Sequence, residues 1–326
     1  MKISLILHLY KNTKYLEKCI KSIFDQTDKN FELIAFSDGI KQEVKDVVKK
    51  FNLDELKNKN IKVIHTNANF GHSVSYNYGA KQATGEYVYY FGSNVILKPD
   101  FISSLNDLID KHSNADIISF NTIKPKAKED EIELLKTIAD DFTKGPFNST
   151  NDKIIKRSYL LDNKIEFKSF KHYPLQFYIQ LAMHKPKWYL YIKQLAEIMP
   201  SSSFTYNIFD LHEQTIDVVE RILETGTYEH QHKNEIEFLV VVTLLSRFLK
   251  NLFIIKPSDS SIQKIAIAKA MNVLESNFSN WKKNKYLVDK NCQLNSKLRN
   301  YFINFKPYPF YIKHAIKKGY FKNNEK

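Results

Sequence analysis

Two short polar turns, each placed directly after an apolar run, carry side chains that could do chemistry in this sequence. Gly92-Ser93-Asn94 follows the aromatic and β-branched run Tyr87–Phe91, and Ser37-Asp38-Gly39 follows Phe31–Phe36. Such runs are typical of strands, and ligands of open α/β sheets bind outside the carboxyl ends of the strands. The two turns are therefore candidate binding loops, and ordinary strand-to-helix turns are the alternative interpretation.

The segments around these turns alternate between strand-like and helix-like patterns. A strand is predicted at Ile3–Leu9, and the apolar residues that follow recur at helical spacing from Leu16 to Phe24. A further strand at Ile61–His65 precedes the loop Asn67–Ser73, whose last residue is predicted to cap the next helix. Strands and helices alternating in this way predict an α/β fold with a mostly parallel sheet.

The later segments continue this pattern and then change to helices. The expected elements are a helix from Phe101, strands at Asp116–Asn121, Lys153–Ser158 and Trp188–Ile192, a helix at Leu175–Met183, and a charged surface excursion at Lys124–Glu133. Past about Asn207 the apolar spacing is helical throughout. We therefore predict two domains, an α/β domain at 1–207 and a mainly helical domain at 208–326.

The charge of the chain is concentrated at its carboxyl-terminal end. Residues 1–243 hold 32 Lys/Arg and 32 Asp/Glu, whereas residues 244–326 hold 17 and 4, so the last segment carries the net charge of +13. Basic side chains interleaved with aromatic ones favour an anionic membrane surface. No recognised nucleic-acid motif accompanies the charge, so no nucleic-acid partner is expected.

The cysteine content and the lengths of the apolar runs indicate the cellular compartment of the protein. Cys19 and Cys292 are far apart and form no Cys-x-x-Cys pair, which argues against a disulfide framework and a thiolate metal site. The first apolar run is too short for a signal peptide, and Phe238–Leu245 is too short to span a bilayer. We expect a cytoplasmic protein.

The order of these segments and the motifs within them resemble glycosyltransferase family 2, the inverting nucleotide-sugar enzymes of the GT-A fold. The resemblance covers nearly the whole chain. Its matching stretches are Ile3–Leu7 with Tyr10 and Lys14-Tyr15-Leu16, Gln26-Thr27 with Asn30–Ile34, Asn69-x-Gly71-x-Ser73 with Asn77 and Gly79, Ala83–Tyr87, Asn151–Ser158, and a tail at Trp281–Tyr286 like those of bacterial cell-surface-polysaccharide members.

This resemblance implies a GT-A nucleotide-sugar-binding domain and a donor of the UDP-hexose type. It also implies that the donor contacts eight residues close to strand ends, namely Tyr10, Asp38, Asn69, Gly71, Asn77, Gly92, Ser93 and Asn94. The implied acceptor is a membrane glycolipid or a cell-surface polysaccharide, which would place the protein peripherally at the inner membrane face.

The sequence departs from the family pattern where the pattern is acidic. The Asp-x-Asp metal motif falls on Gly92-Ser93-Asn94, so Mn²⁺ or Mg²⁺ would lose its usual carboxylates and keep only Asn94 as a candidate ligand. The Glu-Asp pair that supplies the general base falls on Tyr173-Pro174, and the adjacent His172 is the candidate replacement. Arg157 and Lys171 are candidates for the charge that the metal would provide.

Further departures affect the nucleotide pocket. The Asp-Asp pair that reads uracil falls on Ser37-Asp38, so Asp38 is the one carboxylate expected to contact uracil or ribose. The arginine of the Asn-x-Gly helix falls on Tyr76, and the proline at the end of the first strand falls on His8. Tyr76 and Tyr78 are interpreted as core aromatics.

Two functions follow, and the sequence leaves both open. One is a glycosyltransferase with an altered site that needs little or no metal. The other is a catalytically degenerate family member that keeps the fold as a binding or partner subunit. A nucleic-acid binder is the weakest interpretation, because only the basic carboxyl-terminal end supports it.

Overall fold

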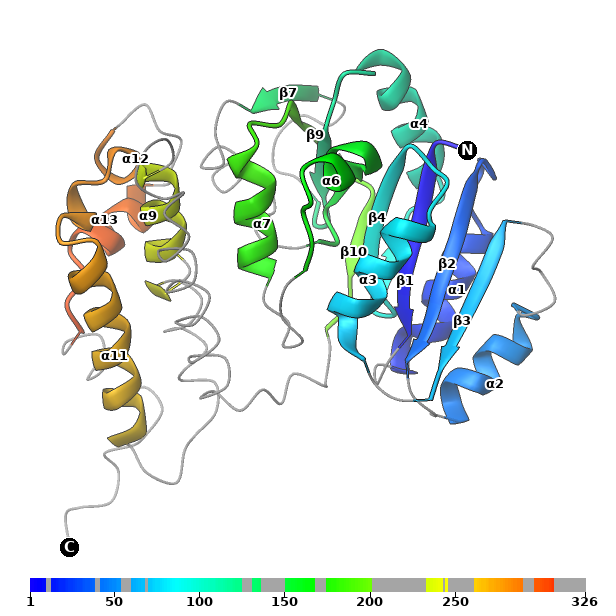
Figure 1. The fold of residues 1–326 in the computed structure, drawn as a ribbon, viewed down its shortest axis with the longest axis horizontal. Coiled ribbons are helices and arrows are strands. Elements are labelled where there is room, and N and C mark those ends of the chain that lie inside the picture. The colour runs from blue at the N-terminus through cyan, green and yellow to red at the C-terminus, as the bar shows by residue number, and fades with distance from the viewer. Residues whose placement is uncertain are drawn as a thin grey trace, which may run out of the picture. The chain divides into compact units, whose positions relative to one another are not determined.

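The computed structural model describes residues 1–9, 13–38, 42–53, 60–67, 70–124, 131–135, 150–167, 174–200, 233–242, 244–245, 261–289 and 296–307. The chain divides into two compact units, Met1–Phe204 and Thr205–Lys326, and each is described by itself (Figure 1). Within the described residues, no helix has the length and apolar character needed to cross a membrane.

An eight-stranded sheet with the order β3-β2-β1-β4-β8-β6-β9-β7 forms the centre of the first unit. Its strands are β1 (Ile3–Leu9), β2 (Phe31–Asp38), β3 (Ile61–Thr66), β4 (Tyr87–Gly92), β6 (Ile117–Asn121), β7 (Glu131–Leu135), β8 (Lys153–Lys156) and β9 (Trp188–Gln194). The four strands from β3 to β4 are parallel, and β6 is parallel to β9. Only β8 and the edge strand β7 run antiparallel to their neighbours. The predicted α/β class with a mostly parallel sheet is confirmed.

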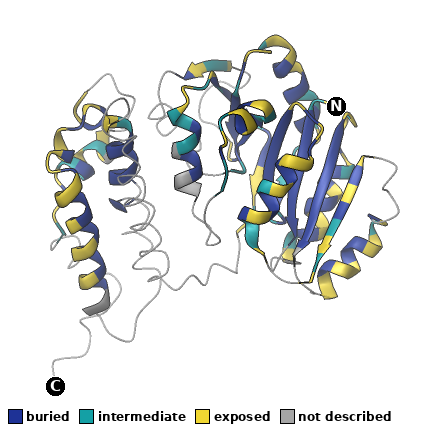
Figure 2. Cartoon of the chain, in the orientation of Figure 1, coloured by how far each residue is buried: buried dark blue, intermediate teal, exposed yellow. Residues whose placement is uncertain are grey.

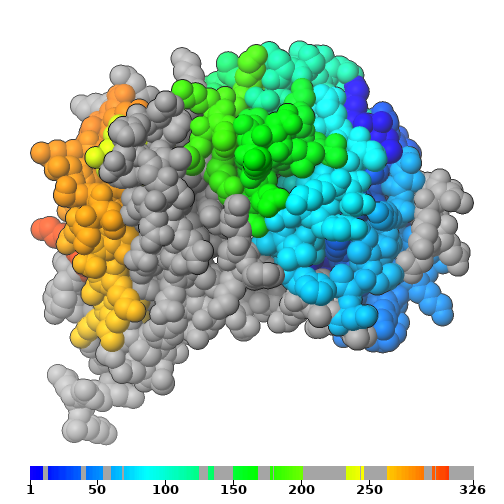
Figure 3. Space-filling view, viewed as in Figure 1, coloured from blue at the N-terminus to red at the C-terminus, as the bar shows by residue number. Residues whose placement is uncertain are grey.

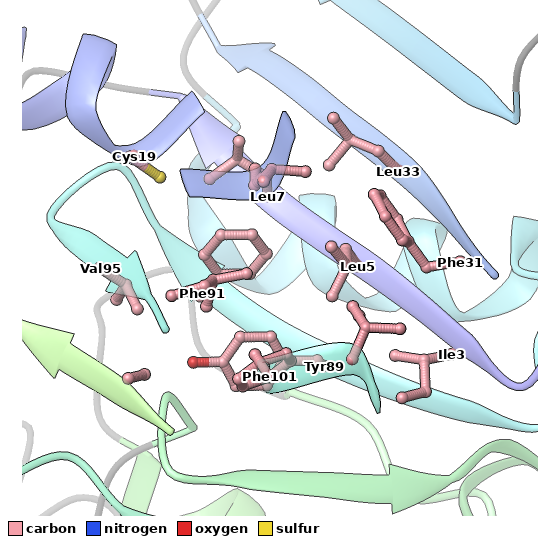
Figure 4. Close-up of a cluster of buried hydrophobic side chains, with 14 of the residues drawn as sticks. Ile3, Leu5, Leu7, Cys19, Phe31, Leu33, Tyr89, Phe91, Val95 and Phe101 are labelled. Carbon is pink, nitrogen blue, oxygen red and sulfur yellow. The ribbon is translucent and has the colours of Figure 1, made fainter. Parts of the chain in front are cut away.

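One face of this sheet is covered by α1 (Leu16–Phe24), α2 (Gln42–Lys50) and α4 (Phe101–Lys111). Alternate residues of β1, including Leu5 and Leu7, lie in one buried cluster with Leu33, Tyr89 and Phe91 (Figure 4). The apolar stripe that the sequence predicts on α1 is buried in the same cluster. Periodic spacing therefore identified the helix face correctly, because side chains three or four residues apart share one face.

The other face of the sheet is covered by α3 (Gly71–Gln82) and α7 (Pro174–Met183), with α6 (Arg157–Asp162) between them in the view of Figure 1. Their residues form the cyan and green surface of Figure 3, and the strands beneath them are buried (Figure 2). A Cβ atom added to Gly79 would lie 2.5 Å from the Ile6 side chain, so α3 approaches β1 very closely. Beside this contact, Tyr90 of β4 packs against Tyr76 and Phe177.

Several local features differ from the predictions or were not predicted. Val95–Leu97, for which no element was predicted, forms a short strand, β5, that pairs antiparallel with β10 (Ala196–Ile198), about 100 residues away. Glu131 and Glu133, expected at the end of the surface excursion Lys124–Glu133, belong to the edge strand β7 (Glu131–Leu135). Ser73 lies inside α3 and does not cap it, because the helix begins at Gly71. The predicted strand that starts at Lys153 ends at Lys156 and continues directly as α6.

The described secondary-structure elements of the second unit are all helices. Its elements are α9 (Lys233–Val242), α11 (Ser261–Asn277), η4 (Trp281–Lys283), α12 (Lys285–Val288) and α13 (Ser296–Ile303). The Asn284 side chain donates hydrogen bonds to the Asn234 carbonyl oxygen at 2.8 Å and to Glu237 Oε1 at 3.0 Å, which joins α12 to α9. Burial raises the pKa of Glu237 despite the hydrogen bond from Asn284. The segment 208–232 lies outside the described residues.

Candidate active site

The two polar turns lie on either side of β1 at the carboxyl edge of the parallel strands. In the strand register, His8 is opposite Gly92 of β4 and Leu9 is opposite Ser37 of β2. Asp38, the last residue of β2, is opposite Thr66 of β3. The fold therefore brings the ends of β1, β2 and β4 together where ligands bind in open α/β sheets.

The turn after β4 is held in place by two hydrogen bonds to Met199. Asn94 donates a hydrogen bond from Nδ2 to the Met199 carbonyl oxygen at 3.0 Å, and the Met199 amide donates to the Asn94 carbonyl oxygen at 2.8 Å. Ser93 is buried, with 4% of its surface exposed. The segment after β10 therefore fixes the turn, which makes it a rigid platform at the sheet edge.

The residues of this turn do not fit a divalent cation. Gly92 offers no side chain, while Ser93 and Asn94 offer neutral oxygens, whereas Mg²⁺ and Mn²⁺ prefer carboxylates. Across the part of the chain that the structure describes, no three His, Cys, Asp or Glu side chains gather as a metal site would require. Among the described residues, the implied metal ion therefore lacks a suitable set of ligands.

Several predicted site residues fall outside the described part of the chain. Tyr10 directly follows β1 in the sequence, and Asn69 lies two residues before the start of α3. Neither residue is described. His172 lies just before α7 and is likewise not described. Asp38 is placed by its backbone at the end of β2, and its side chain is not described. For these four residues the roles given above stay predictions.

Gly71 and Asn77 have structural roles in α3. Gly71 begins the helix with a φ of 78°, a backbone conformation that favours glycine. Asn77 donates from Nδ2 to the Phe167 carbonyl oxygen and accepts from the Phe167 amide, both at 2.9 Å. These two bonds hold the Phe167 segment against α3, and the predicted contact of Asn77 with the nucleotide sugar stays a prediction.

Arg157 does not lie at this edge of the sheet. Its Nε donates to the Ala80 carbonyl oxygen at 2.9 Å, near the carboxyl end of α3, and its backbone amide donates to the Glu86 carbonyl oxygen at 2.7 Å. Glu86 directly precedes β4, so Arg157 lies at the amino edge, opposite the candidate site. The hypothesis that Arg157 replaces the charge of a metal is wrong.

A histidine pair at the carboxyl edge was missed by the sequence analysis. The ring centroids of His8, near the end of β1, and His72, near the start of α3, are 3.9 Å apart with the planes tilted by 46°. The ring centroid of Tyr76 lies 5.6 Å from that of His72 and 6.4 Å from that of His8. The two histidines are 64 residues apart in the chain, so no local pattern joins them. The sequence feature that could have indicated the pair is that each histidine lies at the end of its element that faces the site. Tyr76 is a core aromatic as predicted, whereas Tyr78 is 46% exposed.

A buried ion pair lies at the amino end of β8. Lys153 Nζ contacts the Asp152 carboxylate, and the two side chains are only 1% and 0% exposed. The ammonium group also lies 5.3 Å from the ring centroid of Tyr178 and 5.9 Å from that of Trp188. Since β8 is antiparallel to β4 and β6, its amino end points toward the carboxyl edge of those strands. This pair supports the sheet beside the candidate site.

Comparison with known proteins agrees with this geometry. The chain is 28% identical over 119 residues to the glycosyltransferase GlyG of Streptococcus pneumoniae, covering 36% of this chain and 38% of GlyG. It is 31% identical over 152 residues to an uncharacterized glycosyltransferase of Nostoc sp., covering 45% of this chain and 42% of that protein. The matches thus span less than half the length of these relatives.

The solved structures that resemble the chain share its fold. The crystal structure of S. aureus TarS 1-349 has a TM-score of 0.65 at 17% identity, covering 99% of this chain and 92% of that one. The same TarS fragment in complex with UDP-GlcNAc has a TM-score of 0.64 at 19% identity, with 99% and 93% covered. The model of glycosyl transferase family 2 matches residues 4–173, from β1 to the segment before α7. Because this match covers more than half of the chain, the protein belongs to glycosyl transferase family 2.

Proposed function

We propose that this protein transfers a sugar from a nucleotide sugar, a UDP-hexose, to a membrane glycolipid or a cell-surface polysaccharide. The observation that carries the proposal is the carboxyl edge of the sheet, where the ends of β1, β2 and β4 converge in a fold shared with a TarS fragment solved with UDP-GlcNAc. Asp38 is proposed to contact uracil or ribose, and the Gly92–Asn94 turn to lie against the diphosphate.

Transfer requires two charge movements at this site. The acceptor hydroxyl must lose a proton as it attacks the anomeric carbon, and the departing diphosphate must be stabilised as its negative charge grows. His172 is proposed to take the proton, because it adjoins the position where the family places its carboxylate. A general base contributes about 100- to 10,000-fold to the rate, so replacement of the family's acids should make turnover slow.

The alternative function is that of a partner subunit without turnover. The neutral Gly92–Asn94 turn favours it, since this turn lacks the carboxylates that would hold a metal ion against the diphosphate. In that case the protein would bind a nucleotide sugar weakly or not at all. Transfer and donor-binding assays separate the two functions.

The basic carboxyl-terminal end supports a membrane-associated acceptor. Residues 244–326 hold 17 Lys/Arg against 4 Asp/Glu, and each basic residue close to an anionic lipid surface contributes about 1 kcal/mol to binding. We propose that the protein works at the cytoplasmic face of the membrane, held there peripherally by this end. No nucleic-acid partner is proposed.

The decisive experiment measures hydrolysis and transfer with UDP-GlcNAc and UDP-glucose, in EDTA and in manganese. Slow transfer that does not depend on manganese and is lost in His172→Ala supports the proposal. The matched variant Gly92→Asp/Asn94→Asp restores carboxylates to the turn, and a Cβ atom at Gly92 would meet Asn94 Oδ1 at an ordinary 3.4 Å. Manganese should stimulate this variant only. Brisk manganese-dependent transfer by the unmodified chain would contradict the proposed site, and no transfer by any form would favour the partner subunit.

A further inference from the structure

We propose that His72 binds the diphosphate of the donor as an imidazolium cation and that His8 is the positioning residue behind it. This inference rests on the proposed function and assigns the charge that the family obtains from a metal. The turn that would hold that metal offers only neutral oxygens, yet the leaving diphosphate still needs a cation nearby. The histidine pair lies beside that turn, because His8 is opposite Gly92 in the strand register.

The burial of the two rings separates their roles. His8 is only 2% exposed, whereas His72, in the first turn of α3, is partly exposed. His72 can therefore reach a ligand at the sheet edge, and His8 cannot do so without a rearrangement of the chain. With 3.9 Å between the ring centroids, His8 supports the face of the His72 ring and limits how it can turn.

The surroundings of the pair are aromatic. Tyr76 contacts both imidazoles, and it packs in turn against Tyr90 at 4.9 Å and Phe167 at 5.4 Å between ring centroids. Charges interact more strongly where nearby groups exclude water. A single imidazolium at the rim of this cluster therefore stabilises a diphosphate more than an exposed lysine would.

The groups that face the pair make its charge depend on the ligand. Burial raises the pKa of Tyr76 and of Tyr90, so both phenols stay neutral and provide no counter-charge. Asp38 is the acidic residue at the carboxyl end of β2, next to β1, whereas Glu32 lies at the amino end of that strand. An anion bound beside the positive end of α3, which has no acidic residue in its first turn, favours the charged form of His72. We therefore expect binding to take up a proton.

The donor itself allows a clean test of this proton uptake. Both phosphates of a UDP-sugar are esterified, so they lack the ionisation near pH 6 that a phosphate monoester has. Any pH dependence of binding between about pH 6 and pH 8 then comes from the protein, and histidine is the side chain that ordinarily titrates in this range. Uridine, which has no phosphate, is the matched ligand control.

The experiment is calorimetric titration of the full chain with UDP-GlcNAc and with uridine at pH 6 and pH 8. We expect UDP-GlcNAc to bind about tenfold more tightly at pH 6, in line with one charge-assisted hydrogen bond, and uridine to bind equally at both. Repeating the titration in buffers of different ionisation enthalpy should reveal proton uptake with UDP-GlcNAc only.

Variants assign the effect to the pair. His72→Ala and the size-conserving His72→Gln should bind UDP-GlcNAc about tenfold more weakly at pH 6 and lose the pH dependence. His184→Ala is the control, since His184 is exposed after α7 near the amino end of β9. His8→Phe keeps an aromatic ring against His72 and should shift the midpoint of the pH profile, which a purely structural contact would not do.

The outcomes separate this inference from the proposed function. If the affinity of the unmodified chain for UDP-GlcNAc is the same at pH 6 and pH 8 and is unchanged by substitution of His72, the inference is wrong and the proposed function stands. If the unmodified chain binds no UDP-sugar at either pH, both are wrong. If His8→Phe leaves the midpoint unchanged, the positioning role of His8 is refuted.

Discussion

Replacing Lys153 with methionine should strongly destabilise the first unit, because it removes the ammonium that compensates the Asp152 carboxylate. Both side chains are almost completely buried, so water cannot take over the role of the lost partner. The substitution also removes the cation near the rings of Tyr178 and Trp188, at 5.3 and 5.9 Å. Methionine has a similar length, so the change is mainly one of charge.

The expected loss follows from the burial of the pair. Breaking a buried ion pair from one side costs about 3–5 kcal/mol, whereas an exposed pair is worth about 0–1 kcal/mol. In a unit of roughly 200 residues, each kcal/mol lowers the melting temperature by about 2–4 °C, so Lys153→Met should melt about 6–20 °C lower. The double variant Asp152→Asn/Lys153→Met removes both charges and should recover much of this loss.

The assay is thermal and urea unfolding followed by circular dichroism, with Lys156→Met as the matched control. Lys156 lies three residues further along β8 and pairs with Glu86 at 3.4 Å, but both side chains are partly exposed, at 25% and 42%. It should shift the melting temperature by a few degrees at most. If Lys153→Met melts within 2 °C of the unmodified chain, or no lower than Lys156→Met, the reasoning from burial is refuted.

Three further changes test other parts of the structure. Burial alone would raise the pKa of Glu32, but hydrogen bonds from Ser4, Thr84 and Gly85 outweigh it and lower the pKa below 4.5. The stability that Glu32 contributes is therefore present above about pH 4.5 and is lost as the pH falls through the lower pKa of the folded state. Glu32→Gln should make the urea unfolding midpoint depend less on pH between pH 6 and pH 3.5. If the midpoint of the variant depends on pH as strongly as that of the unmodified chain, this reasoning is contradicted. Gly79→Ala should destabilise by about 1–3 kcal/mol, because its Cβ atom would lie 2.5 Å from Ile6, and an unchanged urea midpoint would show that α3 can move away. The full chain should cosediment with anionic liposomes and not with neutral ones, whereas deletion of 296–326 should weaken this binding; equal binding to both lipids would exclude an electrostatic surface.

The fold class and most of the element order could be predicted from local patterns in the chain. The apolar runs of β1, β2 and β4 and the helical stripe on α1 each indicate which residues are buried, and that information is local. The polar turns after β2 and β4 were likewise visible, because turn residues follow apolar runs directly. Motifs at these positions were enough to predict the family.

Contacts between residues far apart in the chain could not be predicted in this way. The pairing of β5 with β10 and the contact between His8 and His72 join segments that are about 100 and 64 residues apart. Arg157 shows the opposite case, since a residue that charge alone would assign to the site lies at the other edge of the sheet. Local periodicity fixes which face of an element is buried, but it does not encode which strand lies next to which or in what direction β8 runs. Those choices depend on packing across the whole sheet, and they determine which side chains surround the candidate site.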